Sequence, residues 1–173
     1  KTLLPYVQKN KAAIYVNCGD YENVWTLLQN RLPELKSENL CHTHFNNWQE
    51  ECEFATKAVN GSDDFSSNGI HVFCNKDIFA AVYITNLLMR AADFLVTKPS
   101  ELSFYPVPKL MIQHVGGHEC WGAIRAAEVG DGTPECPNLD YACFMLRSFI
   151  ETPDLLEKMN YAIMSNKKAG IYN

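Results

Sequence analysis

The stretch Gln113–Gly122, QHVGGHECWG, combines several side chains that could do chemistry. It places two imidazoles, a carboxylate and a thiol around the pair Gly116-Gly117. Such groups could bind a metal ion, activate a cysteine nucleophile, or mark the turn between a strand and a helix.

The histidine spacing raises the possibility of zinc. Imidazoles two or four residues apart can share a metal ion, as His42 with His44 or His114 with His118 could do. No Cys-x-x-Cys pair is present, which argues against a zinc ribbon. Histidines are also common in polar loops, so we expect no metal and no other cofactor, and we keep zinc as an alternative.

A nucleophile would have to be Cys120, which precedes Trp121 at an expected helix start. The positive end of a helix makes a thiol more reactive. All the histidines lie before Cys120 in the chain, so a catalytic pair would need His71 or His42 as the base. We favour a buried structural thiol.

Phosphate-binding signatures are missing, since neither GxGxxG nor GxxxxGK[ST] occurs. The pair Gly116-Gly117 is therefore interpreted as a strand-to-helix turn, where glycine allows a close backbone approach.

Five strand-helix units in series are expected from hydrophobic periodicity. The expected strands are 12–16, 39–42, 70–74, 109–115 and 141–146. The expected helices are 20–35, 45–59, 78–96, 118–129 and 153–164. One face of the second helix would carry apolar residues at steps of three and four: Phe45, Trp48, Cys52, Ala55 and Val59. The segments 99–108 and 130–137 are expected to be loops.

Alternating strands and helices favour an α/β fold with a parallel sheet covered on both faces. We predict one domain over residues 1–173, with a three-layer, flavodoxin-like sheet of about five strands. An all-α fold is the alternative. In such a sheet ligands gather where the strands end. The rim would then be formed by Asn17–Asp20, His42–Asn47, Cys74–Asp77 and His114–Glu119, and four of the five histidines would lie on it.

Composition limits the partners. The net charge of −5 and the pI of about 5.5 argue against nucleic acid. No apolar run reaches the roughly 18 to 20 residues that a membrane helix needs, so we expect no membrane insertion.

Cysteine usage bears on the compartment. The chain has an odd number of cysteines, seven, and most of them adjoin apolar residues, as buried free thiols do. We therefore expect a cytoplasmic protein. The sequon Asn60-Gly61-Ser62 keeps a secreted protein as the alternative.

Three segments resemble the Toll/interleukin receptor (TIR) domain. Residues 13–25 are similar to its first strand, acidic turn and first helix. Residues 40–48 are similar to its second strand, interaction loop and the tryptophan that opens the second helix, and residues 70–74 to its third strand. The resemblance covers about residues 12–96, with the order of elements matching to the end, and implies a flavodoxin-like fold and signalling in immunity through protein contacts.

The segment departs from the TIR pattern in two places. The Arg-Asp and Pro-Gly of the usual interaction loop are missing, which puts conventional partner recognition in doubt. TIR domains that cleave NAD use a glutamate on the helix after the third strand, where this chain has Tyr83, Thr85 and Asn86. The resemblance therefore implies a non-catalytic domain.

We predict a TIR-like domain that self-associates or binds protein partners. The loop His42-Thr43-His44-Phe45-Asn46-Asn47 would make these contacts, with Phe45 as an anchor and Trp48 in the core. The alternative is a rim enzyme, either one that acts on a nucleotide-like substrate, such as an NAD hydrolase, or a metal-assisted hydrolase. Its binding and acid-base groups would come from the rim residues Asp20, Asp77, His114, His118 and Glu119.

Overall fold

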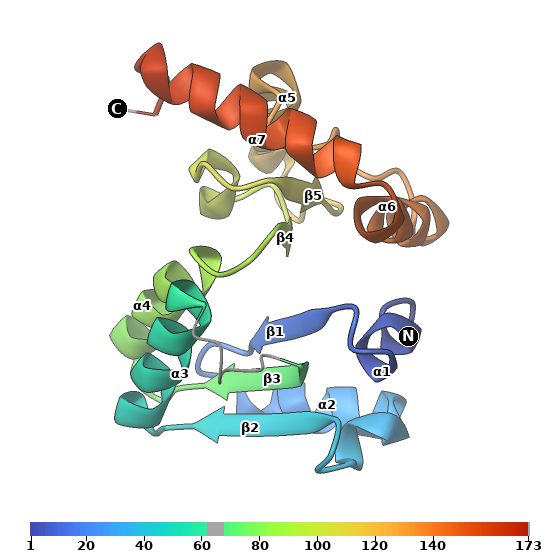
Figure 1. Ribbon diagram of the computed structural model, residues 1–173, viewed down its shortest axis with the longest axis vertical. Helices are drawn as coiled ribbons and strands as arrows, with labels where there is room; N and C mark the ends of the chain where they lie inside the picture. The colour runs from blue at the N-terminus through green and yellow to red at the C-terminus, as the bar shows by residue number, and fades with distance from the viewer. Residues whose placement is uncertain (62–67, 173) are drawn as a thin grey trace. The chain divides into compact units, whose positions relative to one another are not determined.

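The computed structural model describes residues 1–61 and 68–172. The chain divides into two compact units, Leu3–Ala91 and Ala92–Asn173, with Lys1 assigned to the first and Thr2 to the second (Figure 1). The single domain expected from chain length stays a prediction.

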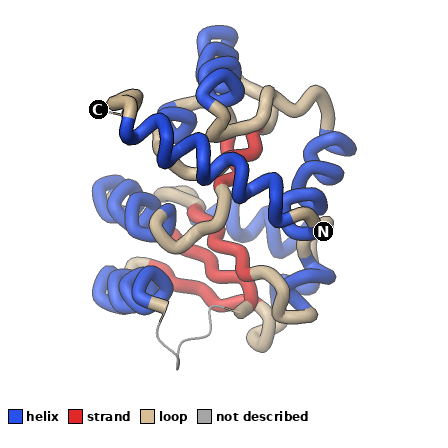
Figure 2. The backbone as a smooth tube through the Cα atoms, turned by 45° about the horizontal axis from the view of Figure 1, so that its top comes forward, coloured by secondary structure: helices blue, strands red, loops and turns tan. Residues whose placement is uncertain are grey.

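Within its described residues, 3–61 and 68–91, the first unit contains a three-stranded parallel sheet and four α-helices. Along the chain the elements are α1 (Leu4–Gln8), β1 (Ala13–Asn17), α2 (Glu22–Arg31), a 3₁₀ turn (Pro33–Lys36), β2 (Cys41–Phe45), α3 (Trp48–Asn60), β3 (Gly69–Cys74) and α4 (Ile78–Met89). The strand order is β1-β3-β2, with all neighbours parallel (Figure 1). Figure 2 shows the strands in red and the helices in blue. Consequently, the carboxyl ends of all three strands lie at one edge of this sheet.

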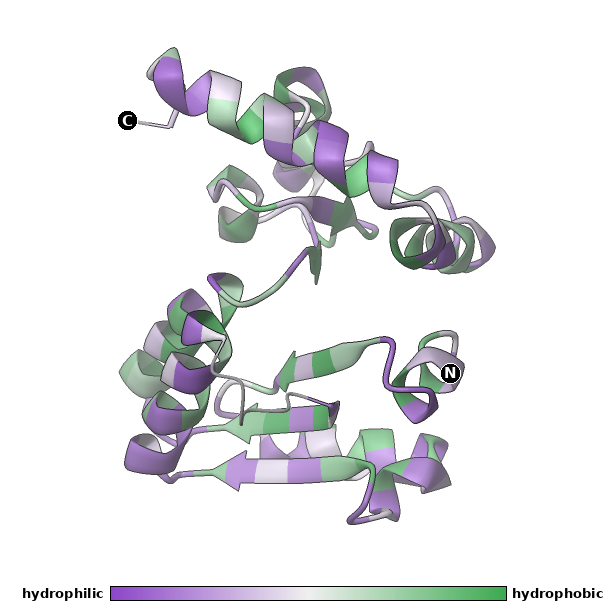
Figure 3. Ribbon diagram, in the orientation of Figure 1, coloured by the Kyte–Doolittle hydropathy of each residue, from purple (hydrophilic) through white to green (hydrophobic). Residues whose placement is uncertain are grey.

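The central strand β3 is buried along its whole length, as expected of a parallel strand covered on both faces. Its residues alternate between two cores. Val72 packs with the cluster that includes Val7 and Trp25, from α1 and α2. Phe73 packs with Phe54 and Ile84, from α3 and α4. The first unit is therefore three layers deep. Figure 3 shows β3 as mostly hydrophobic and the edge strand β2 as mostly hydrophilic.

The second unit contains a two-stranded parallel sheet and three α-helices. Its elements are β4 (Leu95–Thr97), a 3₁₀ turn (Glu101–Phe104), β5 (Lys109–Met111), a second 3₁₀ turn (Gly117–Glu119), α5 (Cys120–Val129), α6 (Leu139–Glu151) and α7 (Pro153–Lys168). The main core contains Leu110 of β5, Phe149 of α6 and Met159 of α7.

A buried ion pair joins β5 to the segment that follows α5. Lys109 Nζ lies 2.6 Å from Asp131 Oδ1, and both side chains are fully buried. The Tyr172 hydroxyl donates to the other Asp131 oxygen at 2.8 Å. Burial lowers the pKa of Lys109, whereas the hydrogen bond and charge of Asp131 act in the opposite direction. Burial also raises the pKa of Tyr172 to about 12, with Asp131 adding to the effect.

Comparison with the sequence-based expectations confirms a mixed fold with parallel strands and contradicts the all-α alternative. Within the described residues, however, the strands form sheets of three and two rather than one sheet of five. The order also differs from flavodoxin, in which the first strand lies between the second and third. Here β3 takes that middle position.

The expected strand over 141–146 is wrong, because these residues lie within α6. Asn138 caps that helix by accepting a hydrogen bond from the Tyr141 amide at 2.8 Å. The apolar residues of this segment satisfy a helical period of 3.6 as well as a strand. A further strand, β4, occupies residues that were expected to end the helix 78–96, since α4 stops at Met89. The helix α1 was not predicted.

The expected helical face of residues 45–59 is also wrong. Phe45 belongs to β2, and α3 starts only at Trp48. The buried face of α3 consists of Glu51, Phe54 and Ala55, so Trp48 is 43% exposed instead of lying in the core. Phe45 is half-buried and packs edge-on against Trp25, with ring centroids 6.4 Å apart.

The expectations about glycosylation and membrane insertion concern particular segments of the chain. Ser62 of the sequon lies outside the described residues. Among residues 1–61 and 68–172, no helix is both long and apolar enough to cross a membrane.

Candidate functional site

The turn between β5 and α5 is organised by Glu119. Its Oε2 accepts hydrogen bonds from the amides of Val115 at 2.9 Å and Gly116 at 3.1 Å. Its Oε1 accepts a hydrogen bond from Lys98 Nζ at 2.5 Å. The hydrogen bond from Lys98, followed by those from the two amides, lowers the pKa of Glu119 to about 2. The carboxylate is thus ionised at neutral pH and holds the turn next to the segment that follows β4.

His114 is tied to a third segment of the second unit. Its Nδ1 lies 2.6 Å from Glu135 Oε2, and its amide donates to Glu135 Oε1 at 3.3 Å. Three segments therefore converge here: the residue after β4, the turn after β5, and the segment after α5. Sequence reasoning identified His114, His118 and Glu119 but missed both of their charged partners, Lys98 and Glu135.

Exposed side chains surround this turn. The side chain of His114 is 37% exposed, and His118 is also exposed. Trp121, in the first turn of α5, is 69% exposed. A side chain at Gly117 would meet no atom within 4 Å, so the space beside the turn is open. We call residues His114–Trp121 with Lys98 and Glu135 the β5–α5 turn site.

Cys120 has a local structural contact in this site. Its thiol donates to the Gly117 carbonyl at 3.1 Å, and the side chain is half-buried. Among the residues that the structure describes, no group of three or more His, Cys, Asp and Glu side chains is arranged to hold a metal ion. The geometry thus supports neither the nucleophile nor the zinc interpretation of this stretch.

The edge of the first sheet uses its polar side chains to build turns and caps. Asn46, at a φ of 53°, accepts a hydrogen bond from the Lys76 amide at 2.8 Å. Asn47 caps α3 and Asp77 caps α4, each through a side-chain oxygen. Asp20 is exposed at the same edge. These groups stabilise the connections between strands and helices.

The predicted interaction loop is mostly strand. His42, Thr43, His44 and Phe45 lie within β2, and only Asn46 and Asn47 follow it. His42 and Thr43 are exposed, whereas His44 is buried. The pair His42 and His44 belongs to the first unit, and His114 and His118 belong to the second. The expectation that His42 and His44 project from a strand end is therefore wrong.

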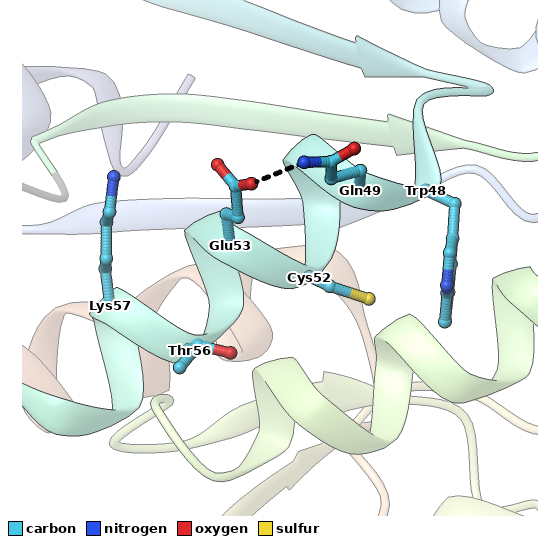
Figure 4. A pocket seen from close by; sticks show the side chains of 6 residues that line it. All are labelled: Trp48, Gln49, Cys52, Glu53, Thr56 and Lys57. Carbon is cyan, nitrogen blue, oxygen red and sulfur yellow. Dashed lines mark hydrogen bonds between the residues drawn. The ribbon is translucent and has the colours of Figure 1, made fainter.

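A pocket of about 510 Å³ lies along α3 (Figure 4). It is lined by Trp48, Gln49, Cys52, Glu53, Thr56 and Lys57. Trp48 extends toward α4, where its ring lies 5.2 Å from that of Tyr83. This lining offers one exposed aromatic ring, a thiol, an amide, a hydroxyl and two opposite charges.

Comparison with known protein families gives a match over the whole chain. The model of a family described as "Domain of unknown function (DUF6938)" matches residues 1–173. No curated protein matches the chain, and no solved structure matches it. The match covers the whole sequence, and the chain belongs to the DUF6938 family.

Proposed function

We propose that the β5–α5 turn site binds a phosphorylated, nucleotide-like ligand. The observation that carries the proposal is the convergence of an exposed indole, two exposed imidazoles and two carboxylates at the start of a ten-residue helix, where a parallel pair of strands ends. Ligands of α/β proteins bind at such strand ends.

Each part of a nucleotide finds a suitable group in the site. The amides at the start of α5 and the imidazole of His118 suit phosphate oxygens, because a helix N-terminus carries partial positive charge. The exposed indole of Trp121 suits a stacked base. The Glu135 carboxylate, which is only partly buried, suits a ribose hydroxyl. Lys98 and Glu119 hold the turn in place for these contacts.

Nucleotide titration of the purified chain tests this proposal. ADP, UDP and NAD are added separately while the amide NMR signals are followed, and we expect the signals of residues 114–121 to shift. Trp121→Ala and His118→Ala should each weaken binding about tenfold or more, because stacking and phosphate contacts are each worth about 1–3 kcal/mol. Trp48→Ala removes an exposed indole from the first unit and serves as the matched control.

Two results would count against the proposal. One is that none of the three nucleotides shifts the signals of residues 114–121 at millimolar concentration. The other is that Trp48→Ala weakens binding as much as Trp121→Ala does.

A second candidate function is protein binding through the α3–α4 face. This face is defined by Trp48, Phe79, Val82 and Tyr83. Phe79 is 81% exposed, and the other three are between 43% and 56% exposed. Clustered exposed aromatic rings are typical of interaction surfaces. The TIR-like signalling role belongs to this candidate, with Trp48 replacing Phe45 as the anchor.

A measurement of self-association tests the second candidate function. If the face joins two copies, sedimentation velocity of the wild-type chain should show a concentration-dependent dimer. Phe79→Ser should weaken this dimer about tenfold, since an aromatic ring buried in an interface contributes about 1–3 kcal/mol. Phe144→Ser removes a 54% exposed ring from α6 and is the matched control. A wild-type chain that stays monomeric at all concentrations would eliminate self-association through this face.

A further inference from the structure

A row of polar contacts connects three elements of the first unit. His44 of β2 contacts Glu50 of α3 through Nδ1 and Oε1, which are 3.1 Å apart. Through Nε2 it contacts His71 Nδ1 of β3, again at 3.1 Å. His71 Nε2 lies 3.2 Å from the carbonyl oxygen of Asn68. Both imidazoles are buried, and both rings pack against Phe54. We call this row the histidine relay.

The number of protons in the relay can be counted from the end at which His71 contacts the Asn68 carbonyl oxygen. A carbonyl oxygen only accepts, so His71 Nε2 must carry a proton. If His71 is neutral, its Nδ1 is bare and the proton of the next contact lies on His44 Nε2. The contact between His44 and Glu50 then needs a proton of its own, on either group. The three contacts thus hold three protons, whereas two neutral imidazoles and a carboxylate carry only two. The count is the same if the extra proton is placed on His71.

We propose that the histidine relay is a pH-sensitive link that takes up one proton to join the start of α3 to the sheet and opens when that proton leaves. Without the third proton, a carboxylate oxygen would face a bare ring nitrogen, and two acceptors repel each other. The outer contact opens first, because the Glu50 side chain is 53% exposed and can turn into solvent, whereas the His44 side chain is only 9% exposed.

The charges around His44 set the direction of the switch. Among the described residues, the titratable groups that face it are His42 on its own strand, His71 on β3 and Glu50 on α3. Burial lowers the pKa of His44, the hydrogen bond and charge of Glu50 raise it, and His42 lowers it again. With the net pKa below the ordinary 6.5, the third proton is bound in acid and is released before the pH reaches the neutral range.

Global stability responds in the opposite sense to the contact itself. A histidine whose pKa is lowered by folding binds fewer protons in the folded chain than in the unfolded chain, so acidification through 6.5 lowers the free energy of unfolding. The proposal must therefore be tested by following the contact between His44 and Glu50, and not by measuring the midpoint of unfolding.

Glu50 also connects the relay to the first turn of α3. Its amide donates to Asn47 Oδ1 at 3.3 Å, and its Oε2 accepts from Asn47 Nδ2 at 2.9 Å. Asn47 is the N-cap of α3. When Glu50 turns into solvent, this reciprocal cap loosens, and the first turn of α3, which begins with Trp48, loses its tie to β2.

Glu50→Gln provides a sharp test. A glutamine amide donates to the bare Nδ1 of a neutral His44, so all three contacts are satisfied without an extra proton. In the wild type we expect the Glu50 amide to be protected from hydrogen exchange about fivefold more at about pH 5 than at about pH 7.5, the ratio that one net hydrogen bond gives. In Glu50→Gln this difference should disappear, with the high protection present at both pH values. Glu53→Gln, on the exposed side of the same helix, should behave like the wild type.

Imidazole nitrogen NMR spectra provide the second readout. His44 Nδ1 should gain a proton as the pH is lowered from about 7.5 to values below the ordinary histidine pKa of 6.5 in the wild type, whereas His71 Nε2 should stay protonated throughout. A His44 Nδ1 that does not titrate in this range would overturn the proposal. So would a pH dependence of the Glu50 amide that Glu50→Gln leaves unchanged.

Discussion

Replacement of Asp131 by alanine is expected to lower the free energy of unfolding of the second unit by about 3–5 kcal/mol. The substitution removes the partner of the buried Lys109 ammonium, which lies 2.6 Å away, and the acceptor of the Tyr172 hydroxyl. Neither Lys109 nor Asp131 is reached by solvent, so water cannot replace the lost contacts. The loss should appear in urea denaturation and as faster hydrogen exchange of the amides in β5 and α6.

An all-apolar variant separates the cost of an orphaned charge from the value of the ion pair. The triple variant K109M/D131L/Y172F removes the Lys109–Asp131 ion pair and the Tyr172 hydroxyl, and it keeps Arg125, whose guanidinium lies 6.0 Å from the centre of the Tyr172 ring. Its free energy of unfolding should lie within about 1–2 kcal/mol of the wild type, because well-packed apolar side chains replace buried ion pairs at little cost. If the triple variant is as unstable as Asp131→Ala, the orphaned charge is not the cause.

Replacement of Phe73 by alanine is expected to destabilise the first unit by about 3–5 kcal/mol. Phe73 is fully buried in the central strand β3. Its ring stacks on His44, with centroids 4.8 Å apart and planes at 14°, and contacts Phe54. The substitution therefore leaves a cavity beneath both β2 and α3. Hydrogen exchange of the β3 amides, together with urea denaturation, measures the effect.

Phe73→Leu is the matched control for that cavity. Leucine keeps most of the apolar volume, so the loss should be about 1–2 kcal/mol. The His44 and His71 rings, whose centroids lie 5.4 Å apart, should keep their contact in this variant, which NMR contacts between the rings would report. Equal losses for the alanine and leucine variants would contradict the cavity explanation.

Local patterns in the sequence predicted those elements whose residues fit only one type of secondary structure. β-branched and apolar residues in 70–74 predict a buried strand, and β3 (Gly69–Cys74) is one. The pair Gly116-Gly117 was correctly placed between a strand and a helix. The segment 141–146 was misread because its apolar run fits a strand and a helix equally well, and the cap at Asn138 was overlooked.

The candidate site could be predicted only in part, for a similar reason. His114, His118 and Glu119 are close in the sequence, so their shared turn was visible. Lys98 was missed because β4 is only three residues long, too short to show a period. Glu135 lies in a segment correctly expected to be a loop, but nothing in a loop sequence indicates which histidine its carboxylate will meet.

What the sequence by itself determined is the alternation of strands and helices from β1 to α4 in the first unit, because apolar periodicity acts over a few neighbouring residues. The tertiary structure alone decided three things: which strand lies in the middle of the first sheet, that Trp48 is exposed while Phe45 is not, and which charges meet. His44 and His71 are 27 residues apart, and Lys98 and Glu119 are 21 apart. Such pairs depend on strand register and packing, which are set by the lowest free energy of the whole chain rather than by any local pattern.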